Sequence, residues 1–158
     1  MMALASLWCA TPAAAAEQST IEVVIDPASG LPRFKPEILF IQPGDEVRFK
    51  SSGRTYASRG IPGMLPEGME PWWGQIGTDI VVTFAEPGLY GHKCGASYRL
   101  GLVGLIIVGD DPPANLTTAR AVPHPAAAAA EFDKLFDKLD QHYRVESANR
   151  ENALSRPH

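Results

Sequence analysis

The chain has 158 residues, of which 45% are hydrophobic, and this length and composition are enough for one small domain with a single core. It carries 14 Lys and Arg against 18 Asp and Glu, which gives a net charge of −4. No segment is basic enough to suggest nucleic-acid binding, and no apolar run reaches the roughly 20 residues that a membrane span needs. We therefore expect neither a nucleic-acid partner nor a membrane span.

Residues 1–16 form an apolar segment that ends in Ala14, Ala15 and Ala16 immediately before Glu17. Small residues at the end of such a stretch are typical of a signal peptidase cleavage site. We expect residues 1–16 to be a signal peptide and the mature chain to be exported to the periplasm. Removal of this segment would leave Cys94 as the single cysteine, so no internal disulfide could form.

Residues 17–109 alternate apolar and polar side chains with a period of two, and Pro and Gly interrupt the pattern at short intervals. We expect strands at residues 21–25, 34–41, 47–49, 79–84, 89–94 and 102–108, with a turn at 42–45 and a long loop over 51–77. Pro36 restricts its strand to a sheet edge or a bulge. Short strands with frequent turns and no helical period indicate an all-β, antiparallel β-sandwich.

The composition changes after residue 109. Residues 110–125 are rich in proline and indicate a linker with room for a short helix. Residues 126–145 place one apolar stripe on a helical face, made of Phe132, Leu135, Phe136, Leu139 and Tyr143. We expect an amphipathic helix that packs against the sandwich, followed by a disordered tail over residues 146–158.

The segment from Tyr90 to Gly104, with the sequence YGHKCGASYRLGLVG, resembles the ligand loop of the cupredoxins, and most of all that of the pseudoazurins. The segment from Gly63 to Gly68 resembles the family stretch that follows the first ligand histidine. The resemblance implies a Greek-key β-sandwich with C-terminal helices. It also implies a blue copper centre that passes electrons to redox partners, rather than an enzyme active site.

In the family, the ligating Cys is followed by a His three residues later and a Met eight residues later, with another His far upstream. Counting from Cys94 places Ser97 at the His position and Leu102 at the Met position. Counting back from Gly63 places Tyr56 at the upstream His position. One family ligand in four is therefore present. The four histidines of the chain are His92, His124, His142 and His158, so none precedes residue 92.

A blue copper centre holds its metal with two imidazole nitrogens and a thiolate, and a weak axial thioether completes it. Leu102 in place of the axial Met would be tolerable alone, because that bond mainly tunes the redox potential. Tyr56 would have to lose a proton with a pKa near 10, and a neutral Ser97 is a poor ligand. We therefore expect a degenerate site without a cofactor. Copper is expected only if an altered site exists around Cys94.

His92 lies two residues before Cys94, so on a strand both side chains face the same side. It is either a replacement ligand, or a base that lowers the thiol pKa, or a core residue. We favour a core residue whose ring nitrogens bond to the backbone, because buried polar groups find partners. Met64 and Met69 could complete a soft Cu(I) site, although loop methionines more often pack in a core.

The loops at the metal end of the family form an apolar patch that docks redox partners. The resemblance places here a partner-binding set of Met64, Leu65, Trp72, Trp73, Tyr98, Arg99 and Leu100. Aromatic side chains with interspersed Arg are typical of binding hot spots. In the other interpretation, Trp72 and Trp73 simply plug the mouth of the sandwich.

Three functions are compatible with these patterns. We favour a non-enzymatic docking or accessory module for a periplasmic protein, which could itself be a redox protein. The alternative is a single-electron carrier with an altered copper site centred on Cys94. The third is a monothiol redox protein, because residues 94–97 match Cys-x-x-Ser. Such motifs open a helix, however, and here a strand is expected to follow.

Overall fold

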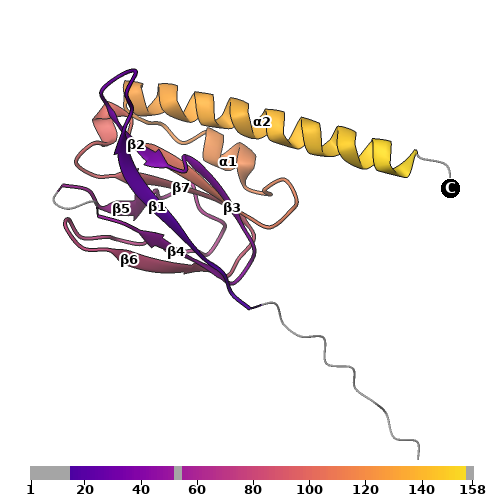
Figure 1. Ribbon diagram of the computed structural model, residues 1–158, viewed down its shortest axis with the longest axis horizontal. Helices are drawn as coiled ribbons and strands as arrows, with labels where there is room; N and C mark the ends of the chain where they lie inside the picture. The colour runs from indigo at the N-terminus through magenta and orange to yellow at the C-terminus, as the bar shows by residue number, and fades with distance from the viewer. Residues whose placement is uncertain (1–14, 52–54, 156–158) are drawn as a thin grey trace, which may run out of the picture.

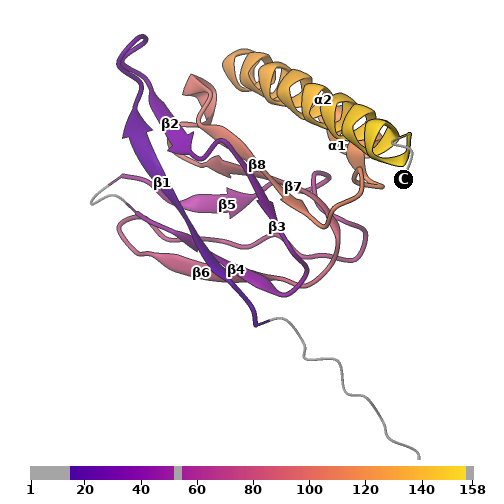
Figure 2. The same cartoon turned by 45° about the vertical axis from the view of Figure 1, so that its right-hand side comes forward.

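The computed structural model describes residues 15–51 and 55–155. The expected signal peptide, residues 1–16, lies outside the described residues except for its last two alanines. The described chain forms two four-stranded sheets that pack face to face, with one long helix laid across the outside (Figures 1 and 2). This arrangement confirms the predicted cupredoxin-like sandwich with a C-terminal helix.

The first sheet has the strand order β2-β1-β4-β6, formed by β2 (Pro32–Lys35), β1 (Gln18–Ile25), β4 (Asp45–Phe49) and β6 (Ile80–Phe84). The second has the order β3-β8-β7-β5, formed by β3 (Ile38–Ile41), β8 (Val103–Val108), β7 (Gly88–Cys94) and β5 (Ser58–Gly60). Each sheet contains one parallel pair, β1 with β4 and β3 with β8. The sandwich is therefore mixed rather than purely antiparallel.

Two strands differ from the sequence pattern. The expected strand over residues 34–41 is divided at Pro36, so that β2 pairs with β1 in one sheet and β3 with β8 in the other. Pro36 has no backbone N–H and cannot continue a ladder of hydrogen bonds. Within the expected loop over 51–77, β5 pairs with β7. The sequence Ser-Arg-Gly of β5 has no apolar alternation that could have predicted it.

The space between the sheets is filled by apolar side chains from alternate strand positions. The buried members of this inner cluster include Ile21, Phe34, Ile41, Val47, Phe49, Phe84, Tyr90, Leu102 and Ile106. Burial of such side chains stabilises the fold by about 1.5–3 kcal/mol each. Cys94 belongs to the same cluster, so the candidate site forms one end of the core.

The opposite face of the second sheet is covered by α1 (Leu116–Arg120) and α2 (Ala126–Leu154) (Figure 2). This outer cluster joins Leu89, Leu105 and Ile107 of the sheet to Phe132, Leu135, Phe136 and Leu139 of α2. All six residues of β8 are buried, because the strand has the inner cluster on one side and α2 on the other. No helix in the described part of the chain is long and apolar enough to span a membrane.

The helix α2 continues to Leu154, beyond the end that we expected at residue 145. The tail predicted over residues 146–158 is therefore wrong as far as residue 154. The sequence of α2 contains no Pro or Gly that would stop a helix, and the next proline is Pro157. The apolar stripe ends at Tyr143, but its end does not mark the end of the helix, since a helix anchored by packing can extend into solvent.

Replacement of Leu139 by Ala tests the packing of α2. Leu139 has no exposed surface, so Leu139→Ala should lower the free energy of unfolding by about 2–5 kcal/mol, as measured by urea denaturation. Gln141→Ala, at an exposed position of the same helix, is the control and should change it by about 0.5 kcal/mol or less. Equal effects of the two substitutions would contradict the packing described here.

Candidate functional site

Cys94 is the last residue of β7, and its side chain points into the inner cluster with only 1% of its surface exposed. It is a free thiol. The backbone N–H of Cys94 donates to the carbonyl oxygen of Leu102 at 3.1 Å, which closes the loop between β7 and β8. The Sγ atom lies 4.0 Å from the carbonyl oxygen of Thr55. The thiol is therefore a packed core group.

His92 is completely buried on the same inward face of β7. Its ring centroid lies 4.5 Å from that of Phe34, 5.3 Å from that of Phe49 and 6.3 Å from that of Trp72. Burial lowers the pKa of this imidazole to about 3, so the ring is neutral near pH 7. Neither ring nitrogen has a hydrogen-bond partner in the described part of the chain. His92 is thus a core residue, but without the backbone hydrogen bonds that we expected.

A missing side chain on the neighbouring strand explains both the position of the ring and its lack of partners. Gly104 of β8 pairs with His92, and a Cβ atom on Gly104 would lie 2.4 Å from Nε2 of His92. The ring therefore occupies the space that any side chain at position 104 would fill. Nε2 lies over the backbone of β8, whose amide and carbonyl groups are engaged by β3 and β7.

The other three residues that we expected at ligand positions carry no imidazole. Tyr56 is half-buried against the inner cluster, and Leu102 has no exposed surface. Ser97 is half-buried, and its carbonyl oxygen accepts hydrogen bonds from the backbone N–H groups of Leu100 and Leu102. In the described residues, no group of three or more His, Cys, Asp or Glu side chains could hold a metal ion. A thiol with a phenol, a hydroxyl and an alkyl group does not fit a blue copper centre.

Met64 and Leu65 contact different clusters, although they are neighbours in the sequence. Met64 is fully buried in the outer cluster, and a Cβ atom on Gly91 would lie 2.8 Å from its side chain. Gly91 faces the side of β7 opposite to Cys94, so Met64 cannot join a soft copper site there. Leu65 packs against the inner cluster, as Trp72 does, and also lines a hollow together with Pro87. Met64 therefore lies apart from Cys94, whereas Leu65 contacts the same cluster as Cys94.

The two tryptophans have different surroundings. Trp72 is half-buried, its ring stacks on Phe49 at a centroid distance of 5.4 Å, and its Nε1 donates to the Ser58 Oγ at 3.1 Å. Trp73 is 67% exposed. The segment runs along β5, so consecutive side chains point to opposite sides. Trp72 therefore closes the sandwich, while Trp73 is available at the surface.

The remaining members of the partner-binding set form the short helix η1 (Tyr98–Leu100), directly after the loop of Cys94. Arg99 and Leu100 are exposed, and Tyr98 is half-buried. The Tyr98 hydroxyl lies 2.6 Å from Nδ1 of His124, just before α2. Burial raises the pKa of Tyr98, and burial followed by the charge of Lys93 lowers that of His124. Both shifts favour a neutral hydroxyl and a neutral imidazole, which share this hydrogen bond.

Sequence reasoning did not assign His124 to the site, since its only signal was its place between two prolines before a helix. A second connection between this loop and α2 runs through Gly101, which has φ +86°. A Cβ atom there would lie 2.9 Å from Cγ of Glu131. Arg33 donates to the Gly101 carbonyl oxygen at 3.4 Å and to Glu131 at 3.1 Å. The loop after Cys94 is thus held at two points: Tyr98 contacts His124, and Gly101 is connected through Arg33 to Glu131 of α2.

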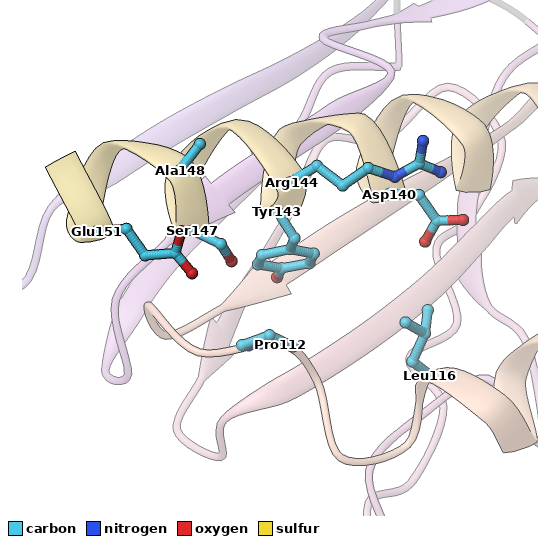
Figure 3. A pocket seen from close by; sticks show the side chains of 8 residues that line it. All are labelled: Pro112, Leu116, Asp140, Tyr143, Arg144, Ser147, Ala148 and Glu151. Atoms are coloured by element: carbon cyan, nitrogen blue, oxygen red, sulfur yellow. The ribbon is translucent and has the colours of Figure 1, made fainter.

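An open groove lies elsewhere on the molecule, between the distal half of α2 and the segment before α1. Figure 3 shows the ring of Tyr143 between the helix and Pro112, with Asp140, Arg144 and Glu151 along the helix. No cysteine or histidine lines this groove. It is therefore separate from the candidate site.

Burial of neutral His92 makes a prediction about pH. Its folded-state pKa of about 3 lies below the ordinary value of 6.5, so on acidification the unfolded chain binds a proton that the folded chain does not. This contribution to stability is complete above about pH 6.5 and decreases as the pH falls toward 3. Between pH 7 and pH 4.5, the chain should lose about 2–3 kcal/mol more stability than His92→Leu in urea denaturation. Parallel stability curves would show that the imidazole is protonated or hydrated within the fold.

Comparison with known proteins gives consistent relatives, although no family model matches the chain. The chain is 31% identical to the pseudoazurin of Methylorubrum extorquens over 80% of its own length and 84% of that protein. It is 36% identical to the pseudoazurin of Paracoccus pantotrophus over 66% of its own length and 72% of that protein.

Solved structures give the same result. The crystal structure of pseudoazurin from Methylobacterium extorquens AM1 superimposes with a TM-score of 0.71 at 30% identity, over 77% of this chain and 98% of that one. Native pseudoazurin from Hyphomicrobium denitrificans superimposes with a TM-score of 0.70 at 26% identity, over 77% of this chain and 97% of that one. The chain therefore belongs to the pseudoazurins, a cupredoxin family of electron carriers rather than enzymes.

Proposed function

We propose that this chain is an exported, copper-free pseudoazurin that works as a docking or accessory module for a redox protein of the periplasm. The observation that carries the proposal is the set of donors around Cys94. Tyr56, Ser97 and Leu102 stand where the family has two imidazoles and a thioether, and no histidine precedes residue 92. Without two imidazole nitrogens, one thiolate cannot hold copper in the geometry that supports rapid electron transfer.

The packing around Cys94 supports the same proposal. Leu102 has no exposed surface, and Trp72 stacks on Phe49 at the end of the sandwich. Apolar side chains therefore occupy the surroundings of the thiol, which is itself 1% exposed. A free cysteine in such surroundings behaves as a small hydrophobic residue.

A role as a monothiol redox protein has less support. Reactive cysteines are partly exposed and have their pKa lowered by a helix N-terminus or a nearby cation. Cys94 is buried, and it is followed by a turn and the short helix η1 rather than by an α-helix. The Cys-x-x-Ser spacing therefore lacks the local structure that makes such a thiol nucleophilic.

One observation favours the alternative, an electron carrier with an altered copper site. His92 lies on the inward face together with Cys94, and both of its ring nitrogens lack partners in the described residues. A neutral imidazole beside a thiolate is a donor pair that soft Cu(I) accepts. Against this, Nε2 of His92 faces the backbone at Gly104, and among the described residues no third His, Cys, Asp or Glu lies with the pair.

The surface near Cys94 supports a docking role. Trp73 is 67% exposed and Leu100 is 51% exposed, and Arg99 is exposed between Tyr98 and Leu100. Exposed aromatic and Arg side chains are the residues that most often dominate binding energies at protein interfaces. A partner that is a redox protein follows from the family to which the chain belongs.

Copper titration tests the missing ligands. Addition of one equivalent of Cu(II) to the mature chain should give no intense thiolate charge-transfer absorption in the visible, because no pair of imidazoles completes the site. The matched variant Tyr56→His/Ser97→His/Leu102→Met restores the family donors on the same scaffold and should become coloured. Colour in the unmodified chain that disappears in Cys94→Ser would overturn the proposal and establish the altered site.

Thiol labelling tests whether Cys94 is a core residue. In the mature chain, an aromatic disulfide reagent should react with the native thiol at least about 100-fold more slowly than with the urea-unfolded thiol. Access requires an opening of the fold that costs several kcal/mol, and each 1.4 kcal/mol corresponds to a factor of ten. Similar rates in both states would instead support a reactive thiol.

A further inference from the structure

Two cationic residues face each other on the outer side of the second sheet, close to the loop of Cys94. Arg59 of β5 and Lys93 of β7 are directly paired in the antiparallel ladder, so their side chains leave the same face of the sheet. Like charges at directly opposite positions destabilise a sheet. The repulsion between Arg59 and Lys93 must therefore be offset by an anion or by other contacts of the two side chains.

No carboxylate of the chain compensates the pair. All 18 Asp and Glu residues lie in the described ranges 15–51 and 55–155. The five ion pairs among those residues connect Arg33, Arg48, Arg120, Lys134 and Lys138 to acidic partners, and include neither Arg59 nor Lys93. The two cations thus have no acidic neighbour within ion-pair distance in the described structure.

Each cation is instead placed against an aromatic ring. The guanidinium carbon of Arg59 lies 3.8 Å from the ring centroid of Trp73, and Nζ of Lys93 lies 4.3 Å from that of Tyr98. Contact with an aromatic face orients a guanidinium but leaves the N–H groups on its edge free to donate hydrogen bonds. The exposed Trp73 ring therefore holds the Arg59 fork in one plane.

The position of Arg59 leaves donors without acceptors. Its Nε is buried and has no hydrogen-bond partner in the part of the chain that the structure describes. A Cβ atom on Gly95 would lie 3.1 Å from its Nη1, so the guanidinium packs against Gly95 in the space that a side chain there would fill. Buried donors without acceptors are costly, and charged donors more so. Because Nε is buried, an acceptor from outside the chain would reach the Nη groups of the guanidinium.

We propose that Arg59 and Lys93 form a binding site for a carboxylate group, with the planar edge of Arg59 as the donor fork and Lys93 as a second positive charge. A guanidinium matches the two oxygens of a carboxylate in a bidentate arrangement, which a point charge does not. The carboxylate belongs either to a small acid or to an acidic side chain of a docked protein. Only this choice of source rests on the proposed docking role.

Nuclear magnetic resonance tests the site directly on the mature chain. Sodium acetate, or the blocked tripeptide acetyl-Leu-Glu-Leu-amide, is added at constant ionic strength while the side-chain Nε–H signal of Arg59 is followed. We expect a saturable shift of this signal. Arg59→Lys keeps the charge but removes the fork, so it should weaken binding about tenfold or more, and Lys93→Gln should weaken it as well. For these variants, binding is followed through the backbone amide of Gly95.

Arg150→Gln is the matched control, because Arg150 is an exposed cation near the far end of α2. It should bind both probes as the unmodified chain does. Tighter binding of the tripeptide than of acetate supports a protein side chain as the source, and equal binding supports a small acid. A signal that does not saturate, or equal affinity in Arg59→Lys and Arg150→Gln, would overturn the site. Copper binding at Cys94 would contradict the proposed function but would not affect the carboxylate site at Arg59 and Lys93.

Discussion

Alternation of side chains along β7 is the constraint on which the rest of the structure depends. Successive residues of a strand point to opposite faces, so His92 and Cys94 enter the aromatic core while Gly91 and Lys93 face the other side. The inward pair places a thiol and an imidazole in an apolar environment. On the outward face, Gly91 leaves space for the side chain of Met64, and Lys93 carries its charge next to the Tyr98 ring. One strand thus separates a buried thiol from a charged surface.

The loop after Cys94 is held by contacts that need no metal. In a metalloprotein, bonds to the ion can supply much of the energy that fixes a ligand loop. Here Tyr98 is hydrogen-bonded to His124, and Arg33 bonds to Gly101 and to Glu131 of α2. The long helix is therefore more than a cover for the sheet, because it fixes the surface that η1 presents. This is how a pseudoazurin scaffold can keep a defined end without the imidazoles that bind copper.

The sequence predicted most of the fold, because the strands of this sandwich alternate clearly and are bounded by Pro and Gly. It did not predict β5, because the three residues of this strand carry no apolar pattern. It also did not predict how far α2 extends, because packing anchors the helix and no Pro or Gly ends it before Leu154. The assignment of Tyr56, Ser97 and Leu102 to ligand positions rests on counting along the chain and stays a prediction. The placement of Met64 could not be predicted, since the path of a long loop depends on tertiary contacts. Nor could the sequence show that His92 lacks hydrogen bonds, because that depends on the space over Gly104.

A single thiol without a pair of imidazole ligands should leave this chain free of copper. The most direct test is the copper content of the protein, measured by elemental analysis after isolation from copper-supplemented cells. The account predicts no stoichiometric copper in the unmodified chain under conditions that load a pseudoazurin with intact ligands. One copper per chain, lost when Cys94 is replaced by Ser, would contradict it.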